Sequence, residues 1–262
     1  MEQPRIVFGF PAFQPSFVER FAPVLASLGG VQAALKSVVD RAYDSLDCWQ
    51  RAILNLGILS GVEMTELLLL AANGCGHGAM KILRSMLETT IDAEYLRLHP
   101  EGFAYYLNWS HAEQWKVYES IRDTAPPEYE LISAEEVERA RAEYAGMPPR
   151  TIELRKRRRW CAVNLREEAD LAGLGQLYGL LNPLASTLLH GGMYSLMLHF
   201  KPSDVHRIDV PPDLKWCQQA VVGGHSCLLQ NISTLSAGLQ IQPEPSIEAL
   251  ERGFGEAWDR LA

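Results

Sequence analysis

Apolar residues recur every three or four positions along most of this chain, which is the spacing of one face of an α-helix. No stretch keeps the strict alternation of apolar and polar residues that a half-buried β-strand requires. Neither an internal repeat nor a low-complexity tract interrupts the pattern. We therefore predict an all-α protein, a multi-helix bundle with long antiparallel helices and no significant sheet.

Helix caps and helix breakers divide this pattern into segments. Gly29-Gly30 should end a short first helix, and Asn73-Gly74 should separate the third helix from the fourth. His99-Pro100 should end the fourth, because the residue before a proline is biased away from helical geometry. Pro183 is expected near the start of a helix. The predicted helices cover residues 16–28, 31–59, 63–72, 79–98, 101–122, 133–145, 165–171, 174–200 (as one helix or two), 213–238 and 246–261.

The chain has 262 residues, which is long enough to bury a large core. We expect a single all-helical domain in three parts. Residues 1–30 would form an N-terminal arm and a short helix, and residues 31–200 would form the core bundle. Residues 201–262 would add C-terminal helices that pack on that bundle.

Composition describes the environment of the protein better than its function. Hydrophobic residues make up 47% and charged residues 21%, as in an ordinary soluble globular protein. The net charge of −8 argues against broad, non-specific binding to nucleic acid or anionic membrane, although a local basic patch could still bind phosphate. The most apolar run, residues 67–72, is too short to span a bilayer, and no signal peptide opens the chain. The five cysteines show no C-x-x-C spacing, so we expect a cytoplasmic protein with no membrane partner.

The segment with the most chemistry is 79–98, where Arg84, Glu88 and Asp92 recur every four residues inside an apolar helical pattern. Three charges at this spacing lie within one arc of about 80° on a helix. Two interpretations stay open. The arc faces inward, where it could bind or orient a phosphate or a metal, or it forms with Lys81 a solvent-facing stripe of alternating charge.

A second candidate is His190. Ser186, His190 and Tyr194 stand at four-residue intervals on one predicted helix face. Histidine titrates near neutral pH and is therefore the natural proton shuttle, and Gly191-Gly192 would permit close approach of the backbone. The alternative is a packing face of small residues around one hydrogen-bonded core histidine.

Two weaker patterns remain. Three histidines beside glycines, His77, His190 and His225, could bind zinc or iron together with Glu88 or Asp92. No ligand spacing joins these residues and no cofactor motif is present, so we predict neither a metal nor a cofactor and keep metal binding as an alternative.

The second of these patterns is a basic run before Trp160. It comprises Arg150 and the cluster from Arg155 to Arg159. Such a run could grip phosphates of nucleic acid, or it could be a solvated face.

The segment from Arg84 to Leu96, R-S-M-L-E-T-T-I-D-A-E-Y-L, resembles a family of bacterial all-helical proteins of uncharacterised function. That family shows an R-S-x-x-E helix, then a helix rich in tyrosine and tryptophan, and then a distal series of tryptophan, tyrosine and histidine. Here the distal series is Trp160, Tyr178 and His190, so the resemblance extends over roughly residues 31 to 200.

The resemblance implies that Arg84, Glu88, Tyr178 and His190 converge in the bundle. It also implies, more loosely, kinship with HEPN-like helical domains, many of which are metal-independent ribonucleases in toxin and phage-defence systems. Those enzymes carry an arginine four to six residues before a histidine on one helix, and no arginine stands there before His190.

Three functions follow as hypotheses. The first is a module that handles a phosphate or RNA in stress or phage defence, with His190 as general acid/base, Arg84 neutralising the phosphate and Glu88 orienting Arg84. The second is a non-enzymatic homodimeric interaction module in which the cluster only fixes the core. The third is the metal-binding protein. The residues expected to line the binding site of the first are Asp92, Tyr178, Asn182 and Tyr194.

Overall fold

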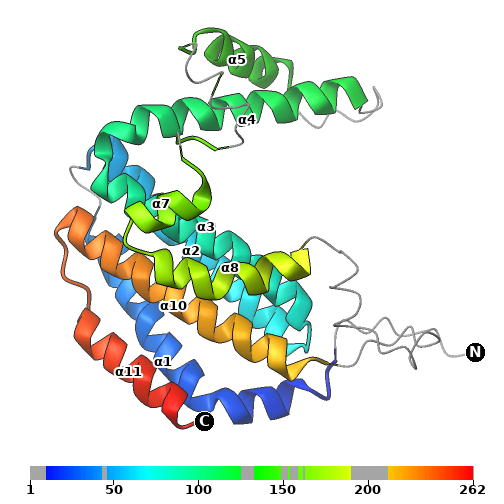
Figure 1. Ribbon diagram of the computed structural model, residues 1–262, viewed down its shortest axis with the longest axis vertical. Coiled ribbons are helices and arrows are strands. Elements are labelled where there is room, and N and C mark those ends of the chain that lie inside the picture. Colours follow the sequence, from blue (N-terminus) through cyan, green and yellow to red (C-terminus); the bar gives the residue numbers. More distant parts are fainter. Residues whose placement is uncertain are drawn as a thin grey trace, which may run out of the picture.

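The computed structural model describes residues 10–42, 46–124, 133–148, 153, 159–161, 163–189 and 212–261. These residues form helices and no strand, so the predicted all-α class is confirmed (Figure 1). The elements are α1 (Gln14–Arg41), α2 (Cys48–Ala72), α3 (Gly76–Leu98), the short 3₁₀ helix η1 (Pro100–Gly102), α4 (Phe103–Thr124), α5 (Ala134–Ala145), α7 (Leu165–Leu171), α8 (Gly175–Leu189), α10 (Leu214–Leu239) and α11 (Ile247–Asp259).

The first helix is longer than predicted. Helix α1 continues through Gly29 and Gly30 to Arg41, so the predicted end at the two glycines is wrong. Each glycine costs about 1 kcal/mol relative to alanine inside a helix. That cost is outweighed because one apolar face continues across both glycines with unbroken spacing. Its buried members include Phe17, Phe21, Val24, Leu28, Val31, Leu35 and Val38.

The next two predicted helices are also divided differently. The predicted helix over 31–59 is wrong, because α1 ends at Arg41 and α2 begins at Cys48. The separate helix over 63–72 is wrong as well, because it is the second half of α2. The side chain of Gln50 accepts a hydrogen bond from the backbone N–H of Asp47 at 2.9 Å. This Asp-x-x-Gln pattern is a capping box that the sequence already contained.

Other predicted boundaries are confirmed. Asn73-Gly74 forms the turn between α2 and α3, with Gly74 at a φ of +73°. Helix α3 ends immediately before His99-Pro100, and Ser133 and Asp213 cap α5 and α10 with their side chains. Pro183 lies in the middle of α8 rather than near its start.

Helices α2, α3 and α10 form the centre of the bundle, each packed against the other two. Helices α7 and α8 pack along α3, and α1 and α11 cover another side of the bundle (Figure 1). Helices α1 and α2 are each long and apolar enough to cross a membrane by length and composition. Core helices of soluble proteins meet the same criterion, so the absence of a membrane partner stays a prediction.

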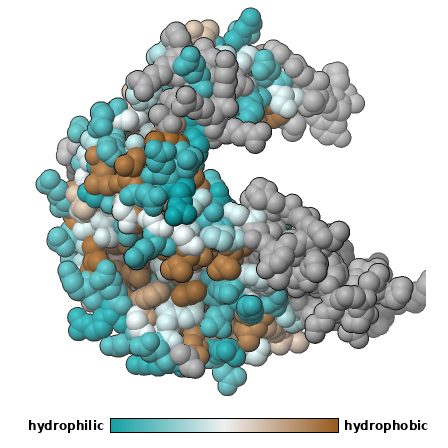
Figure 2. All heavy atoms as spheres, viewed as in Figure 1, coloured by the Kyte–Doolittle hydropathy of each residue, from teal (hydrophilic) through white to brown (hydrophobic). Residues whose placement is uncertain are grey.

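Helices α4 and α5 pack on each other and form an arm that projects from one end of the bundle (Figure 1). Figure 2 shows the surface hollowed between this arm and the bundle. The first turns of α4 join the arm to the core. There the ring of Tyr106 meets Trp160 edge-on, with centroids 5.2 Å apart.

Candidate functional site

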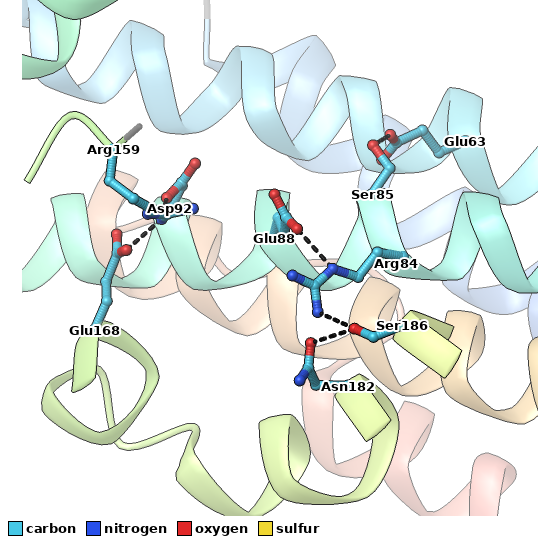
Figure 3. A network of polar contacts seen from close by, with 9 residues as sticks. All are labelled: Glu63, Arg84, Ser85, Glu88, Asp92, Arg159, Glu168, Asn182 and Ser186. Carbon is cyan, nitrogen blue, oxygen red and sulfur yellow. Dashed lines mark hydrogen bonds and ion pairs between the residues drawn. The ribbon is translucent and has the colours of Figure 1, made fainter. Parts of the chain in front are cut away.

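The arc formed by Arg84, Glu88 and Asp92 on α3 faces other parts of the protein. Their side chains keep 18%, 39% and 18% of their surface exposed. Figure 3 shows Arg84 directed at α8 and Asp92 directed at Arg159, with Glu88 beside Arg84. The solvent-stripe interpretation is therefore wrong for Arg84 and Asp92, whereas Glu88 is partly exposed beside Arg84 and Lys81 is exposed. We call the arc and its partners the α3 seam; the partners are Arg159, Glu168, Asn182 and Ser186.

At one end of the seam, Arg84 connects α3 to α8. Its Nε donates to Oε1 of Glu88 at 2.6 Å, and its Nη1 donates to Oγ of Ser186 at 2.9 Å. The hydroxyl of Ser186 donates in turn to Oδ1 of Asn182 at 3.1 Å (Figure 3). Nη2 of Arg84 makes no hydrogen bond to another residue in the described part of the chain. Glu88 and Ser186 thus hold the guanidinium in one orientation, and among the described residues Nη2 is without a partner.

The predicted site residues on α8 are only partly accounted for. Asn182 and Ser186 meet Arg84 as described, whereas the Tyr178 ring lies under the guanidinium of Arg166, 5.9 Å away. His190 and Tyr194 lie outside the described residues. The convergence of Arg84 and Glu88 with His190 therefore stays a prediction.

At the other end of the seam, Arg159 lies between two carboxylates. Its Nη2 donates to Oδ1 of Asp92 at 2.6 Å and also to Oε2 of Glu168 on α7 (Figure 3). Asp92 accepts a second hydrogen bond, from the indole Nε1 of Trp160 at 3.0 Å. These contacts tie the segment 159–161 and α7 to α3.

Burial controls the charges at this end. Glu168 is fully buried, and this burial, with the nearby carboxylate of Asp92, raises the pKa of Glu168 to about 8. Burial lowers the pKa of Arg159, but the two carboxylates outweigh that effect and raise it above its ordinary value. Burial also raises the pKa of the neighbouring Cys161 thiol to about 12. The site therefore holds a carboxyl group that binds a proton near neutral pH.

Arg159 and Glu168 were missed as site residues by the sequence interpretation, which treated Arg159 only as one member of a basic run. Glu168 carried a usable signal, because Leu165, Ala169 and Ala172 place it on the apolar face of its short helix. No comparable signal exists for Arg159, since its partner Asp92 is 67 residues away in the sequence.

The histidine on α10 has a different environment. His225 is fully buried, its ring meets Phe254 edge-on with centroids 4.6 Å apart, and neither ring nitrogen has a partner among the described residues. Burial lowers its pKa to about 4, so the ring is neutral. The described residues contain no group of three or more histidine, cysteine, aspartate or glutamate side chains that could hold a metal ion. Glu88 and Asp92 contact arginines instead.

A further buried carboxyl group, that of Glu63, lies on α2 where this helix packs against α3. Glu63 accepts a hydrogen bond from the hydroxyl of Ser85 (Figure 3). Burial raises the pKa of Glu63 above its ordinary value. This contact fastens α2 to α3.

Two grooves lie elsewhere on the described surface. One, of about 420 Å³, lies between α8, α10 and α11. The other, of about 520 Å³, lies between α2 and α4. Neither of them is lined by a residue of the α3 seam. Hydrophobic residues also gather on the face that α8 and α10 present in Figure 2.

Fold and seam together define an all-helical bundle with a partly buried arginine–carboxylate seam along its central helix. Residues 63–207 match the Family of unknown function (DUF5677), and the chain belongs to that family. This segment contains the whole α3 seam and His190. No match is found among curated proteins or among solved structures. The predicted membership of an uncharacterised family is confirmed, whereas kinship with HEPN-like domains stays a prediction.

Proposed function

We propose that the Arg84 end of the α3 seam binds a phosphate group of RNA. The supporting observation is the state of the guanidinium. Glu88 and Ser186 hold two of its nitrogens, and Nη2 has no partner among the described residues. A planar guanidinium fixed in this way presents the N–H groups of Nη2 to a phosphate oxygen without a further loss of side-chain freedom.

His190 completes this proposal as the general acid/base. It follows Ser186 by four residues in the sequence, and a histidine near neutral pH both accepts and returns a proton. In RNA cleavage it would take the proton of the 2′-hydroxyl as that oxygen attacks the phosphorus. The proton would then pass to the departing 5′-oxygen, leaving a 2′,3′-cyclic phosphate. Arg84 would neutralise charge on the phosphoryl oxygens, and Glu88 would keep Arg84 in place.

The charge of the chain limits the size of the contact. With a net charge of −8, the protein as a whole repels a polyanion, so binding must depend on a local site. We expect a short RNA footprint of one or two phosphates. The logarithm of the affinity should then fall with the logarithm of salt concentration with a slope of roughly 0.7 per phosphate.

The test is binding and cleavage of a fluorescently labelled single-stranded RNA by four proteins: wild type, Arg84→Gln, His190→Ala and the control Arg97→Gln. Arg97 is a matched control because it lies on α3, keeps 25% of its side chain exposed and pairs with Glu94. We expect Arg84→Gln to lose at least about tenfold in affinity, which corresponds to about 1.4 kcal/mol. His190→Ala should bind RNA and not cleave it, and Arg97→Gln should do both. Equal RNA affinity in all four proteins would contradict the proposal.

The second candidate function is a non-enzymatic interaction module, favoured by the Asp92 end of the seam. There one arginine holds α3, α7 and the segment 159–161 together, which is a structural role. If the whole seam has that role, Arg84→Gln should lower the melting temperature and leave RNA binding, if any, unchanged. The same four proteins therefore discriminate between the two functions.

A further inference from the structure

None of the described helices covers the outer face of α2 over much of its length. Seven exposed residues follow one another there at intervals of three or four, within an arc of about 80°. Three of them are large and apolar: Leu59, Val62 and Leu69 are 45%, 51% and 62% exposed. We call this set the α2 stripe; it comprises Cys48, Arg51, Asn55, Leu59, Val62, Glu66 and Leu69.

The first half of the α2 stripe forms one wall of the groove of about 520 Å³ between α2 and α4. The opposite wall comes from the first turns of α4 and includes Phe103, Tyr106 and Leu107. Leu107 is 41% exposed and adds to the apolar surface of Leu59. Contiguous apolar surface of this kind on a helix and an adjoining groove is typical of a site for another helix.

The charges on the stripe indicate which helix fits. Arg51 and Glu66 are the charged residues of the α2 stripe, fifteen positions or about 22 Å apart on one helix face. Nε of Arg51 donates to the carbonyl oxygen of Leu46 at 3.2 Å, which directs this side chain along the start of the helix. A parallel two-fold pair of these helices would place Arg51 beside Arg51 and Glu66 beside Glu66. An antiparallel two-fold pair places Arg51 opposite Glu66 at both ends.

We propose that the α2 stripe is a homodimer interface in which α2 of one copy packs antiparallel on α2 of a second copy. The two-fold axis passes between Ile58 and Leu59, which brings the exposed Leu59 side chains together at the centre. Leu69 of each copy then lies opposite Cys48 of the other. The Leu59–Leu69 half of each helix fills the α2/α4 groove of the other copy. This interface does not involve the α3 seam and does not depend on the proposed function.

The first test is the oligomeric state of the full chain at micromolar concentration, measured by sedimentation equilibrium. The wild type should be a dimer. Leu59→Asp places a charge at the centre of the interface and should raise the dissociation constant at least about tenfold. Val18→Asp is the matched control, because Val18 is 47% exposed on α1, and it should leave the dimer unchanged. A monomeric wild type would overturn the proposal. The same holds for a monomer that instead binds phosphatidylcholine vesicles through α2.

The second test addresses the antiparallel direction. Arg51→Glu should weaken the dimer at low salt, and Glu66→Arg should do the same, because each puts like charges opposite each other. The double variant Arg51→Glu/Glu66→Arg should restore the wild-type dissociation constant. A double variant as weak as the two single variants together would overturn the proposed pairing.

The third test addresses the register. Cys48 is a free and exposed cysteine. In a Leu69→Cys variant, diamide should oxidise Cys48 of one copy and the introduced thiol of the other to an interchain disulfide while the diamide is reduced. The band of a covalent dimer should be absent from the matched variant Leu69→Cys/Cys48→Ser. Equal amounts of covalent dimer in both variants would contradict the register.

Discussion

The two ends of the α3 seam are built from the same residue types and have opposite character. At the Arg84 end, one guanidinium meets one carboxylate and the hydroxyl of Ser186, which in turn meets Asn182, and Glu88 keeps 39% of its side chain exposed. At the Asp92 end, one guanidinium meets two carboxylates, and the side chain of Glu168 has no exposed surface. The four positions from Glu88 to Asp92 thus lead from a partly exposed ion pair, the hydrated end, to a group of three side chains around the fully buried Glu168, the dry end.

Burial accounts for the contrast between the two ends. Near water, an arginine with an unused donor is solvated, and a ligand oxygen can replace that water at modest cost. Away from water, a surplus carboxylate cannot stay ionised cheaply, so it binds a proton instead. We therefore interpret the Asp92 end as an anchor and the Arg84 end as the part of the seam that could exchange partners.

The largest expected effect is at the dry end. Arg159→Gln leaves Asp92 and Glu168 close together without their shared cation. Breaking a buried ion pair in this way costs about 3–5 kcal/mol of unfolding free energy, which urea denaturation would measure. The control is Lys36→Gln, which removes a surface pair with Asp40 and should cost less than about 1 kcal/mol. Similar losses of unfolding free energy in the two variants would contradict the interpretation of the Asp92 end as an anchor.

The pH dependence of stability should show the same anchor. The pKa of Glu168 is raised to about 8 in the folded protein from an ordinary value of 4.5. Between these values the folded state keeps a proton that the unfolded state has lost, so stability should fall as the pH rises. One proton gives a slope of up to about 1.4 kcal/mol per pH unit. Glu168→Gln, which mimics the protonated acid, should flatten this slope; an unchanged slope would assign the proton to another group.

A smaller effect is expected at the hydrated end. Arg84→Gln removes hydrogen bonds to Glu88 and Ser186, but water can reach Glu88. We expect a loss of about 1–2 kcal/mol in the free energy of unfolding. Adding Glu88→Gln should recover part of it. A loss of unfolding free energy as large as that of Arg159→Gln would mean that the two ends of the seam are equally dry. It would contradict the contrast between them.

The smallest effect is expected at Lys81, one helical turn before Arg84 on the same arc. Lys81 is exposed, so Lys81→Ala should change the free energy of unfolding by no more than about 0.5 kcal/mol. Thermal unfolding of Arg159→Gln, Arg84→Gln and Lys81→Ala should then show losses of stability that decrease in this order. A large loss of unfolding free energy in Lys81→Ala would instead indicate that the Lys81 side chain has a partner, which its exposure does not suggest.

Much of the helix order could be predicted, because its signals are local. The capping box at Ser133 and the proline after His99 act within four residues of themselves. The errors arose where tertiary packing overrode such a signal. Gly29-Gly30 is a sound helix terminator by composition, yet burial of the α1 face on both sides of it keeps the helix intact.

The candidate site shows the same limit more sharply. The four-residue spacing of Arg84, Glu88 and Asp92 was enough to place them on one face of a helix. It could not decide between solvent and protein, because Lys81 shares the arc and makes a surface stripe of alternating charge equally possible. The answer came from α8, whose Ser186 is 102 residues from Arg84 in the sequence.

The helical class, most helix ends and the alignment of three charges on α3 therefore follow from local sequence. Helical periodicity, caps and breakers are set by residues that are close together in the chain, so the sequence alone reveals them. The position of Arg159 between Asp92 and Glu168, and the complete burial of Glu168, depend on how the helices pack. Burial depends on which helices meet, and the protonation of Glu168 follows from that burial, so neither could be derived from local spacing.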